Sequence, residues 1–288
     1  MISALIRSSR PLQWVKNLLV LAAPAAAGEL PRNSVWLREG VIFALFCAAA
    51  SGIYLVNDLL DREADRAHPT KRNRPIAAGV VPPRVAWAVA IALLAVSLAG
   101  ALVWCNRTTA VVLAIYVVLQ LAYCVSFKHL PLIDIAVLAS GFLLRTIAGG
   151  TAVDIPLSHW FLITVGFGSL MVAGAKRYSE LITVGHGSGT RSALSRYSPD
   201  YLRFVWQAGA TAAMLTYCLW ATSVPANPTV LAAREISIVP MVMVVLRYCQ
   251  LTDRGSAEEP EFVLVRDRAI QVFGFCWAVV FVIAAGLR

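Results

Sequence analysis

Charged side chains are scarce in this sequence. Aspartate, glutamate, lysine and arginine make up 14% of its 288 residues, whereas soluble proteins carry about 25%. Hydrophobic residues reach 59%, the mean hydropathy is +0.70, and the apolar residues form long runs. Runs of about 20 apolar residues are typical of membrane-spanning helices. The scarcity of charge therefore excludes an ordinary soluble domain and predicts an all-α, polytopic membrane protein, with residues 1–288 in one transmembrane domain.

Histidine is rare and paired cysteine is absent. The four histidines have no metal-ligand spacing, and the six cysteines stand singly without a CxxC pair. We therefore expect neither a zinc site nor a disulfide framework, and we interpret the cysteines as small buried hydrophobic residues.

Acidic residues are fewer than basic ones. The sequence has 16 aspartates and glutamates against 25 lysines and arginines, which gives a net charge of +9. In a membrane protein this excess indicates topology and anionic substrates or lipid headgroups, not nucleic acid.

The apolar runs predict nine membrane-spanning helices. Nineteen of the 25 lysines and arginines fall on the side that holds the N-terminus, and five fall on the opposite side. By the positive-inside rule, we expect the N-terminus and the active site on the cytoplasmic side of the plasma (inner) membrane. Long polar loops at about 58–83 and 177–202 suggest two related four-helix halves plus a ninth helix. The expected spans are 13–30, 36–57, 84–104, 108–127, 131–153, 159–176, 203–223, 235–251 and 269–287.

The densest group of charges follows the second span. Asn57, Asp61 and Asp65 are spaced at i, i+4 and i+8, so a continuous helix places them on one face, with Asp58 about 100° round it. Such oxygen-bearing side chains suit Mg²⁺, which also takes substrate phosphates. Asn57 and Asp61 are the predicted metal ligands, and Asp58, Asp61 and Asp65 the predicted catalytic acids. The alternative is a solvated loop whose mixed charges only support a helix end.

Basic and hydroxyl side chains near the same membrane face are candidates for binding an anionic substrate. Arg145 lies inside the fifth span, where a charge is costly and usually serves function. Asp134 is about 16 Å away along that helix, too far to pair with it. For the other basic candidates, the alternative role is anchoring at the membrane surface. For Lys128 and Arg177, substrate binding and anchoring are equally compatible with the sequence. The predicted substrate-binding residues are Lys16, Tyr54, Lys71, Arg74, Lys128, Arg145, Lys176 and Arg177.

Residues 57–75 resemble the first signature of the UbiA superfamily of intramembrane prenyltransferases. They read NDxxDxxxD at 57–65 and NRP at 73–75. The resemblance covers nearly the whole chain and implies a nine-helix UbiA-like bundle. Typical members carry a second aspartate-rich motif after the sixth span. Here that place reads Lys176-Arg177-Tyr178-Ser179-Glu180, then Gly189-Thr190-Arg191, with a single acid.

This departure, together with PLQWVKN at 11–17 and HPTKR at 68–72, is similar to the actinobacterial decaprenyl-phosphate phosphoribosyltransferase branch of the superfamily. The resemblance implies transfer of 5-phosphoribose from 5-phosphoribosyl 1-diphosphate to a polyprenyl phosphate, with release of pyrophosphate, for cell-wall arabinan precursor synthesis. In this hypothesis Mg²⁺ and the lysines hold the donor's phosphates, and Arg145 or Arg177 holds the lipid phosphate.

Two rival functions stay open. One is a UbiA-type enzyme that moves a prenyl chain from a prenyl diphosphate to an aromatic acid, and the missing second aspartate motif argues against it. The other is a transporter built from repeated halves, which an intramembrane arginine also fits. The carboxylates at the membrane edge, away from the midplane, argue against transport. The sequence leaves the oligomeric state open, a homo-oligomer included.

Overall fold

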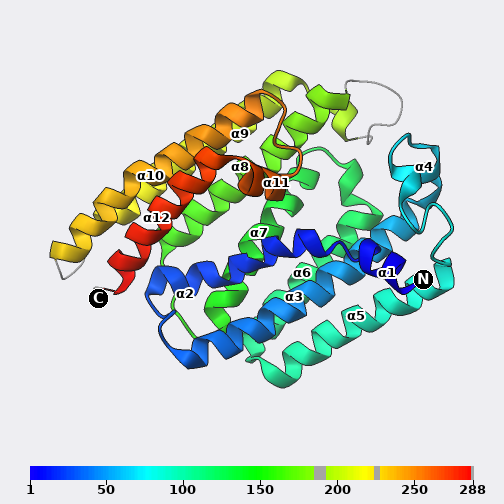
Figure 1. Ribbon diagram of the computed structural model, residues 1–288, viewed down its shortest axis with the longest axis horizontal. Helices are drawn as coiled ribbons and strands as arrows, with labels where there is room; N and C mark the ends of the chain where they lie inside the picture. Colours follow the sequence, from blue (N-terminus) through cyan, green and yellow to red (C-terminus); the bar gives the residue numbers. More distant parts are fainter. Residues whose placement is uncertain (185–192, 224–227, 287–288) are drawn as a thin grey trace.

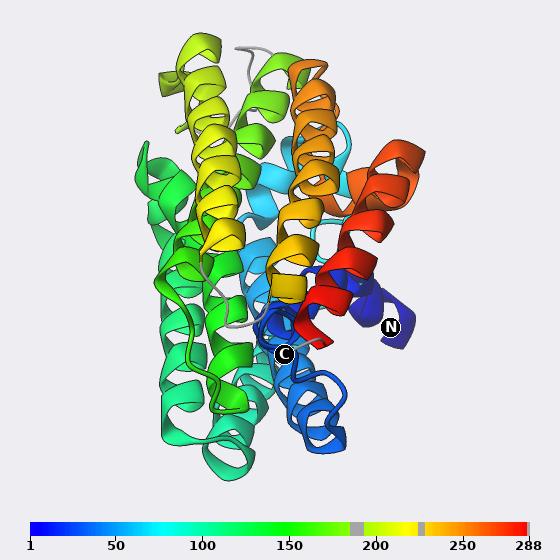
Figure 2. The ribbon, with the colours of Figure 1, turned by 90° about the vertical axis from the view of Figure 1, so that its left-hand side faces the viewer.

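The computed structural model describes residues 1–184, 193–223 and 228–286, and every regular element in these ranges is a helix (Figure 1). The long helices lie side by side and run roughly along one axis (Figure 2). Their bounds are α3 (Asn33–Leu60), α5 (Pro83–Trp104), α6 (Arg107–Val125), α7 (Ile133–Ala152), α8 (His159–Val184), α9 (Pro199–Thr222), α10 (Pro228–Asp253) and α12 (Arg268–Gly286). The shorter elements are α1 (Ile2–Ser8), η1 (Pro11–Leu21), α2 (Ala22–Ala27), α4 (Arg62–Ala67), η2 (Lys71–Asn73), η3 (Phe127–His129), η4 (Leu194–Arg196) and α11 (Pro260–Arg266).

Five described helices are long and apolar enough to cross a membrane, namely α3, α5, α6, α7 and α10. The pair α11 and α12 adds a sixth if it counts as one span with a bend of 88°. Helices α8 and α9 also coincide with expected spans, but they do not meet this criterion of length and composition over their described residues. A polytopic helical membrane protein is thus supported, and the total of nine spans stays a prediction.

Two hydrophobic cores divide the bundle, and α7 lies between them. The first core joins η1, α3, α5 and α6, and it includes Phe46 and Leu113. The second joins α8, α9, α10 and the α11–α12 segment, and it includes Tyr178. Ala148 of α7 belongs to the first core, whereas Ile135 of the same helix belongs to the second. Side chains of α7 therefore reach the space where the two cores meet.

The first expected span, 13–30, is not a single α-helix. It consists of the 3₁₀ helix η1, the short helix α2, and a break after them. Trp14 donates a hydrogen bond to Ser51 at 3.1 Å, and Asn17 donates one to Cys47 at 3.2 Å. Both bonds reach α3, and 14 and 17 are three residues apart, the spacing at which side chains align in a 3₁₀ helix. Trp14 and Asn17, which interrupt the apolar run of this expected span, thus attach η1 to α3.

The packing of η1 against α7 depends on Gly149. A Cβ atom added there would lie 1.8 Å from the carbonyl oxygen of Val20. Gly149→Ala should therefore push η1 away from α7 and lower the free energy of unfolding by about 1–3 kcal/mol, measured by denaturation in mixed detergent micelles. Gly166→Ala on α8 is the matched control, because its added Cβ has open space and alanine favours a helix. Equal stabilities of the two variants would contradict this packing.

Candidate functional site

A polar cavity of about 160 Å³ lies among η1, α3, α6, α7 and α8. Arg10, Lys16, Arg145 and Lys176 contribute four cationic side chains to its wall, and none of the described residues that line it is acidic. Guanidinium and ammonium groups bind phosphate through charge-assisted hydrogen bonds, so this wall suits a phosphorylated ligand. The lining is Arg10, Gln13, Lys16, Ala50, Ile53, Tyr54, Asn57, Tyr116, Gln120, Tyr123, Cys124, Leu138, Gly141, Phe142, Arg145 and Lys176.

Five of the residues predicted from the sequence come together in this cavity: Lys16, Tyr54, Asn57, Arg145 and Lys176. The sequence prediction missed Gln13 of η1, and it also missed three uncharged residues of the apolar helix α6, namely Tyr116, Gln120 and Tyr123. Arg10 was counted only as a topological charge, although its position directly before the first polar span was a usable signal.

Arg145 is buried, with 6% of its surface exposed, and among the described residues it forms no ion pair with a carboxylate. Its Nε donates to Oδ1 of Asn17 at 2.7 Å, and Nη2 donates to the hydroxyl of Tyr116 at 2.8 Å. Nη1 donates to the carbonyl of Gly141, one turn back on α7. The guanidinium is thus held by neutral groups from three elements, and its charge is available to an anion in the cavity.

The helix that carries the acidic residues breaks at Asp61, between α3 and α4. Asp58 and Asp65 are both buried, and both accept a hydrogen bond from Nη1 of Arg74, at 3.2 and 2.7 Å. Asp58 accepts a second one from Nη2 of Arg10 at 2.6 Å. The acidic residues therefore do not form the single stripe expected for a continuous helix. Arginines neutralise the two buried carboxylates, so no metal ion is needed between them.

Asp61 points to a different partner, Lys128 of η3, and its Oδ1 forms an ion pair with the lysine Nζ. Its backbone N–H donates to the carbonyl of Asn57 at 2.9 Å, so Asn57, which lines the cavity, lies one turn before it. Within the described ranges, no three His, Cys, Asp or Glu side chains form a group that could hold a metal. A magnesium ion held by Asn57 and Asp61 would therefore need substrate phosphates to complete its coordination, and this metal site stays a prediction.

Arg177 is 1% exposed, and its guanidinium is engaged on every side. Nε donates to Oδ2 of Asp134 at 2.7 Å, Nη1 donates to Oε2 of Glu180 at 2.6 Å, and Nη2 donates to the hydroxyl of Tyr123 at 2.5 Å. Asp134 thus pairs with Arg177 and not with Arg145. Since Tyr123 lines the polar cavity, Arg177 supports the cavity wall from behind.

The Arg177 network continues to Tyr197, between η4 and α9. The Tyr197 hydroxyl donates to Oδ1 of Asp134 at 2.6 Å and accepts a bond from the backbone N–H of Leu132. Burial, together with the hydrogen bond to Asp134, raises the pKa of Tyr197 above its ordinary value, so the hydroxyl remains a donor at neutral pH. These bonds fix the start of α7, where Leu132 has a φ of +70°.

Two further residues predicted from the sequence lie outside the polar cavity. Lys71 is half-buried in η2, and Lys128 is buried beside Asp61. The stretch Gly189-Thr190-Arg191, where the sequence departs from the second motif of typical members, falls outside the described residues. The donor-binding role of Lys71 and Lys128 therefore stays a prediction that depends on how far the substrate extends from the cavity.

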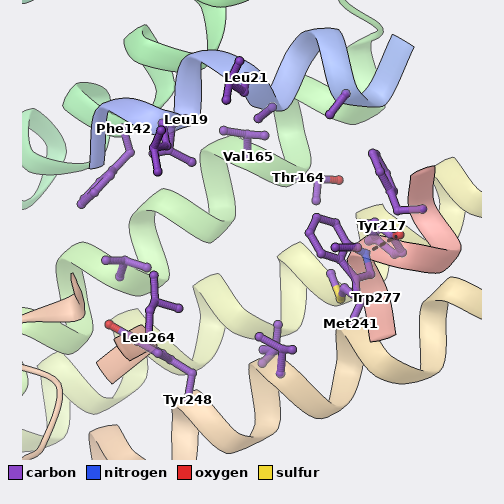
Figure 3. A pocket seen from close by; sticks show the side chains of 18 of the residues that line it. Leu19, Leu21, Phe142, Thr164, Val165, Tyr217, Met241, Tyr248, Leu264 and Trp277 are labelled. Carbon is purple, nitrogen blue, oxygen red and sulfur yellow. Dashed lines mark hydrogen bonds between the residues drawn. The ribbon is translucent and has the colours of Figure 1, made fainter. Parts of the chain in front are cut away.

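A larger and almost wholly apolar cavity of about 710 Å³ lies between η1, α2, α8, α10 and α12. Figure 3 shows Leu19 and Leu21 of η1 across the space from Met241 and Tyr248 of α10. Lys16 and Phe142 line this cavity and the polar one, so the two cavities adjoin at these side chains. The pair of spaces suits a compound with an anionic head and a long apolar tail.

The model of the UbiA prenyltransferase family matches residues 18–266. The chain belongs to the UbiA prenyltransferase family. The resemblance predicted from residues 57–75 is thereby confirmed.

The UbiA fold is confirmed by solved structures. A UbiA homolog from Archaeoglobus fulgidus, bound to DMAPP and Mg²⁺, aligns with a TM-score of 0.75 at 17% identity, covering 98% of this chain and 97% of that one. A UbiA homolog from Aeropyrum pernix aligns with a TM-score of 0.59 at 19% identity, covering 100% and 97%. At such low identity the likeness shows the fold alone.

More similar UbiA-family relatives bear a common name. The decaprenyl-phosphate phosphoribosyltransferase of Mycolicibacterium smegmatis is 47% identical over 289 residues, which cover 96% of this chain and 91% of that protein. The protein of the same name from Corynebacterium glutamicum is 44% identical, covering 97% and 86%. The similarity therefore extends over nearly the whole length of this UbiA chain.

Proposed function

We propose that this protein transfers 5-phosphoribose from 5-phosphoribosyl 1-diphosphate to a polyprenyl phosphate and releases pyrophosphate. The observation that carries the proposal is the junction of a cationic cavity with an apolar one at Lys16 and Phe142. The cationic cavity suits the phosphates of a soluble donor, and the apolar cavity suits a polyprenyl chain. The shared name of the relatives supports the same reaction with a decaprenyl acceptor, whose product would serve cell-wall arabinan synthesis.

In the proposed reaction, the bond between C1 of the ribose and the diphosphate oxygen breaks, and an oxygen of the lipid phosphate bonds to C1. A phosphate monoester has a second pKa of about 6, so the acceptor is largely ionised at pH 7 and needs no strong general base. Lys176 and Tyr54 hold the donor's phosphates, and Arg145 faces the lipid phosphate. The apolar cavity keeps water away from the reacting carbon, which disfavours hydrolysis of the donor.

Asn57 and Asp61 are the proposed magnesium ligands, together with phosphate oxygens of the donor. When bound, magnesium supplies positive charge that stabilises the departing pyrophosphate. Lys128 orients Asp61 through their ion pair. Asp58 and Asp65 hold Arg10 and Arg74 in place, so their proposed contribution is to shape the cation-rich wall of the site.

The test is an assay with the purified protein in detergent. Labelled 5-phosphoribosyl 1-diphosphate and a polyprenyl phosphate should give a lipid-extractable labelled product with Mg²⁺, and at least about tenfold less after chelation of the metal. Release of pyrophosphate from a prenyl diphosphate and an aromatic acid, without any labelled lipid from the first pair, would identify an ordinary prenyltransferase. Because detergent micelles hold no gradient, product formation would also exclude transport as the primary role.

A further inference from the structure

One carboxylate lies where the proposed reaction needs an anion to bind. Glu261, in the first turn of α11, is the only acidic side chain among the described residues that line the apolar cavity. It is 4% exposed, and in the described part of the chain neither of its oxygens has a hydrogen bond of regular geometry. A buried carboxylate with so little compensation is costly, so its position calls for a physical reason.

The partner of Glu261 is Lys16, whose Nζ lies 3.0 Å from Oε2. Lys16 lines both cavities, whereas Glu261 lines only the apolar one. In η1, Gln13, Lys16 and Leu19 lie at 3₁₀ spacing on one line. Gln13 lines the polar cavity and Leu19 the apolar one, so Lys16 stands at the boundary. The ion pair therefore marks the place where an amphiphile in both cavities changes from apolar tail to charged head.

We propose that Glu261 is a positioning residue for the acceptor, and that the lipid phosphate takes its place on Lys16. This inference rests on the proposed function, and it assigns Lys16 to the acceptor phosphate, in contrast to the donor role expected from the sequence. Without acceptor, Glu261 balances the charge of Lys16 and holds its amine at the boundary. The acceptor's phosphate, with higher charge and more oxygen acceptors, displaces the carboxylate.

The exchange gives a basis for selecting the acceptor's head group. A polyprenyl phosphate replaces one anion beside Lys16 with another, so the lysine stays paired throughout. An uncharged polyprenol with the same tail cannot replace Glu261 on Lys16 and gains only the apolar contacts. Specificity of this kind comes from the difference between the two binding free energies. Lys16 thereby favours phosphorylated lipids over free polyprenols of equal length, and Glu261, as the competing anion, lowers the affinity for the phosphorylated lipid alone.

The experiment measures binding of farnesyl phosphate and of farnesol to the full-length protein in detergent by titration calorimetry, without any donor. Glu261→Gln removes the competing charge and keeps the shape, so farnesyl phosphate should bind about tenfold more tightly, as expected if the competing pair is about 90% formed. Farnesol should bind with unchanged affinity. Glu258→Gln, an exposed change three residues earlier, is the matched control and should alter neither affinity.

A double-mutant cycle separates the exchange from a general structural effect. In the Lys16→Gln background, farnesyl phosphate should bind more weakly, and Glu261→Gln should then have no effect on its affinity. The proposal is overturned if Glu261→Gln leaves farnesyl phosphate binding unchanged, weakens it, or strengthens farnesol binding equally. Binding is read without turnover, so the two proposals fail separately. A Lys16-dependent exchange without phosphoribosyl transfer would contradict the proposed function alone.

Discussion

Asp61→Asn should lower kcat/KM for phosphoribosyl transfer by about 100- to 1,000-fold, the range found when one preorganised electrostatic group is removed from an active site. Asp61 is the one aspartate of the 57–65 motif whose described contacts leave it without an arginine partner. Its side chain is 24% exposed, which is compatible with a bound metal and a soluble donor. Asparagine keeps the shape of the side chain but binds Mg²⁺ more weakly, so activity should also require more Mg²⁺.

The measurement is a Mg²⁺ titration of initial rate, with the labelled donor, for purified wild-type and variant protein. Glu63→Gln is the matched control, because Glu63 is exposed, lies two residues away and pairs only with the exposed Arg66 among the described residues. It should keep wild-type activity and the wild-type Mg²⁺ requirement. An Asp61→Asn enzyme with full Mg²⁺-dependent turnover would remove Asp61 from the proposed metal site.

Arg177→Gln should lower the free energy of unfolding by about 3–5 kcal/mol, as expected when one partner of a buried ion pair is removed. The change leaves the carboxylate of Asp134 buried without its guanidinium, and it also deprives Glu180 and Tyr123 of a donor. The double variant Arg177→Gln/Asp134→Asn should recover part of the loss, because the most deeply buried carboxylate is then replaced by a neutral amide, while Glu180 still lacks its arginine partner. Denaturation in mixed detergent micelles measures these differences.

Arg254→Gln serves as the control, since it removes an exposed arginine near the same end of the bundle and should change stability by less than about 0.5 kcal/mol. The sequence suggested that Arg177 binds the lipid phosphate, whereas its contacts favour a structural role. Unchanged stability together with a specific loss of acceptor binding would support the substrate-binding role instead.

The helical fold and some of the cavity-lining residues, such as Arg145 and Lys176, could be predicted from sequence. The bilayer imposes a local requirement on each spanning segment, so apolar runs located α3, α5, α6 and α7 without tertiary information. A charged residue within a membrane-spanning segment also indicates, without tertiary information, that its side chain faces a cavity. Arg145 was expected to face a cavity because burial in lipid is costly, and it does line the polar cavity.

Other features depended on contacts between distant segments. Hydropathy cannot distinguish the 3₁₀ geometry of η1 from an α-helix, since that geometry accompanies the docking of Trp14 and Asn17 on α3. A single stripe at i, i+4 and i+8 requires a helix that continues past Asp61, whereas the helix breaks there. Arg74 returns from a later loop and donates hydrogen bonds to both Asp58 and Asp65. The spacing of the aspartates along the sequence does not predict these contacts of Arg74.

The burial of Glu261 is another feature that the sequence does not predict. It belongs to the stretch Glu258-Glu259-Pro260-Glu261, whose three glutamates cannot be distinguished from one another by the sequence. Two of them are exposed and only Glu261 is buried, because α11 turns by 88° relative to α12 and carries it towards η1. Neither composition nor periodicity signals such a bend, so the residue was not among the predicted site residues.

The absence of acidic side chains from the described wall of the polar cavity has a consequence for the end of the catalytic cycle. Pyrophosphate remains highly charged after its bond to C1 of the ribose has broken. It then faces a wall that holds Arg10, Arg145 and Lys176 and has no acidic side chain among its described lining residues. The features that capture the donor thus also retain the leaving group. Release of pyrophosphate, and not the chemical step, is therefore expected to limit kcat.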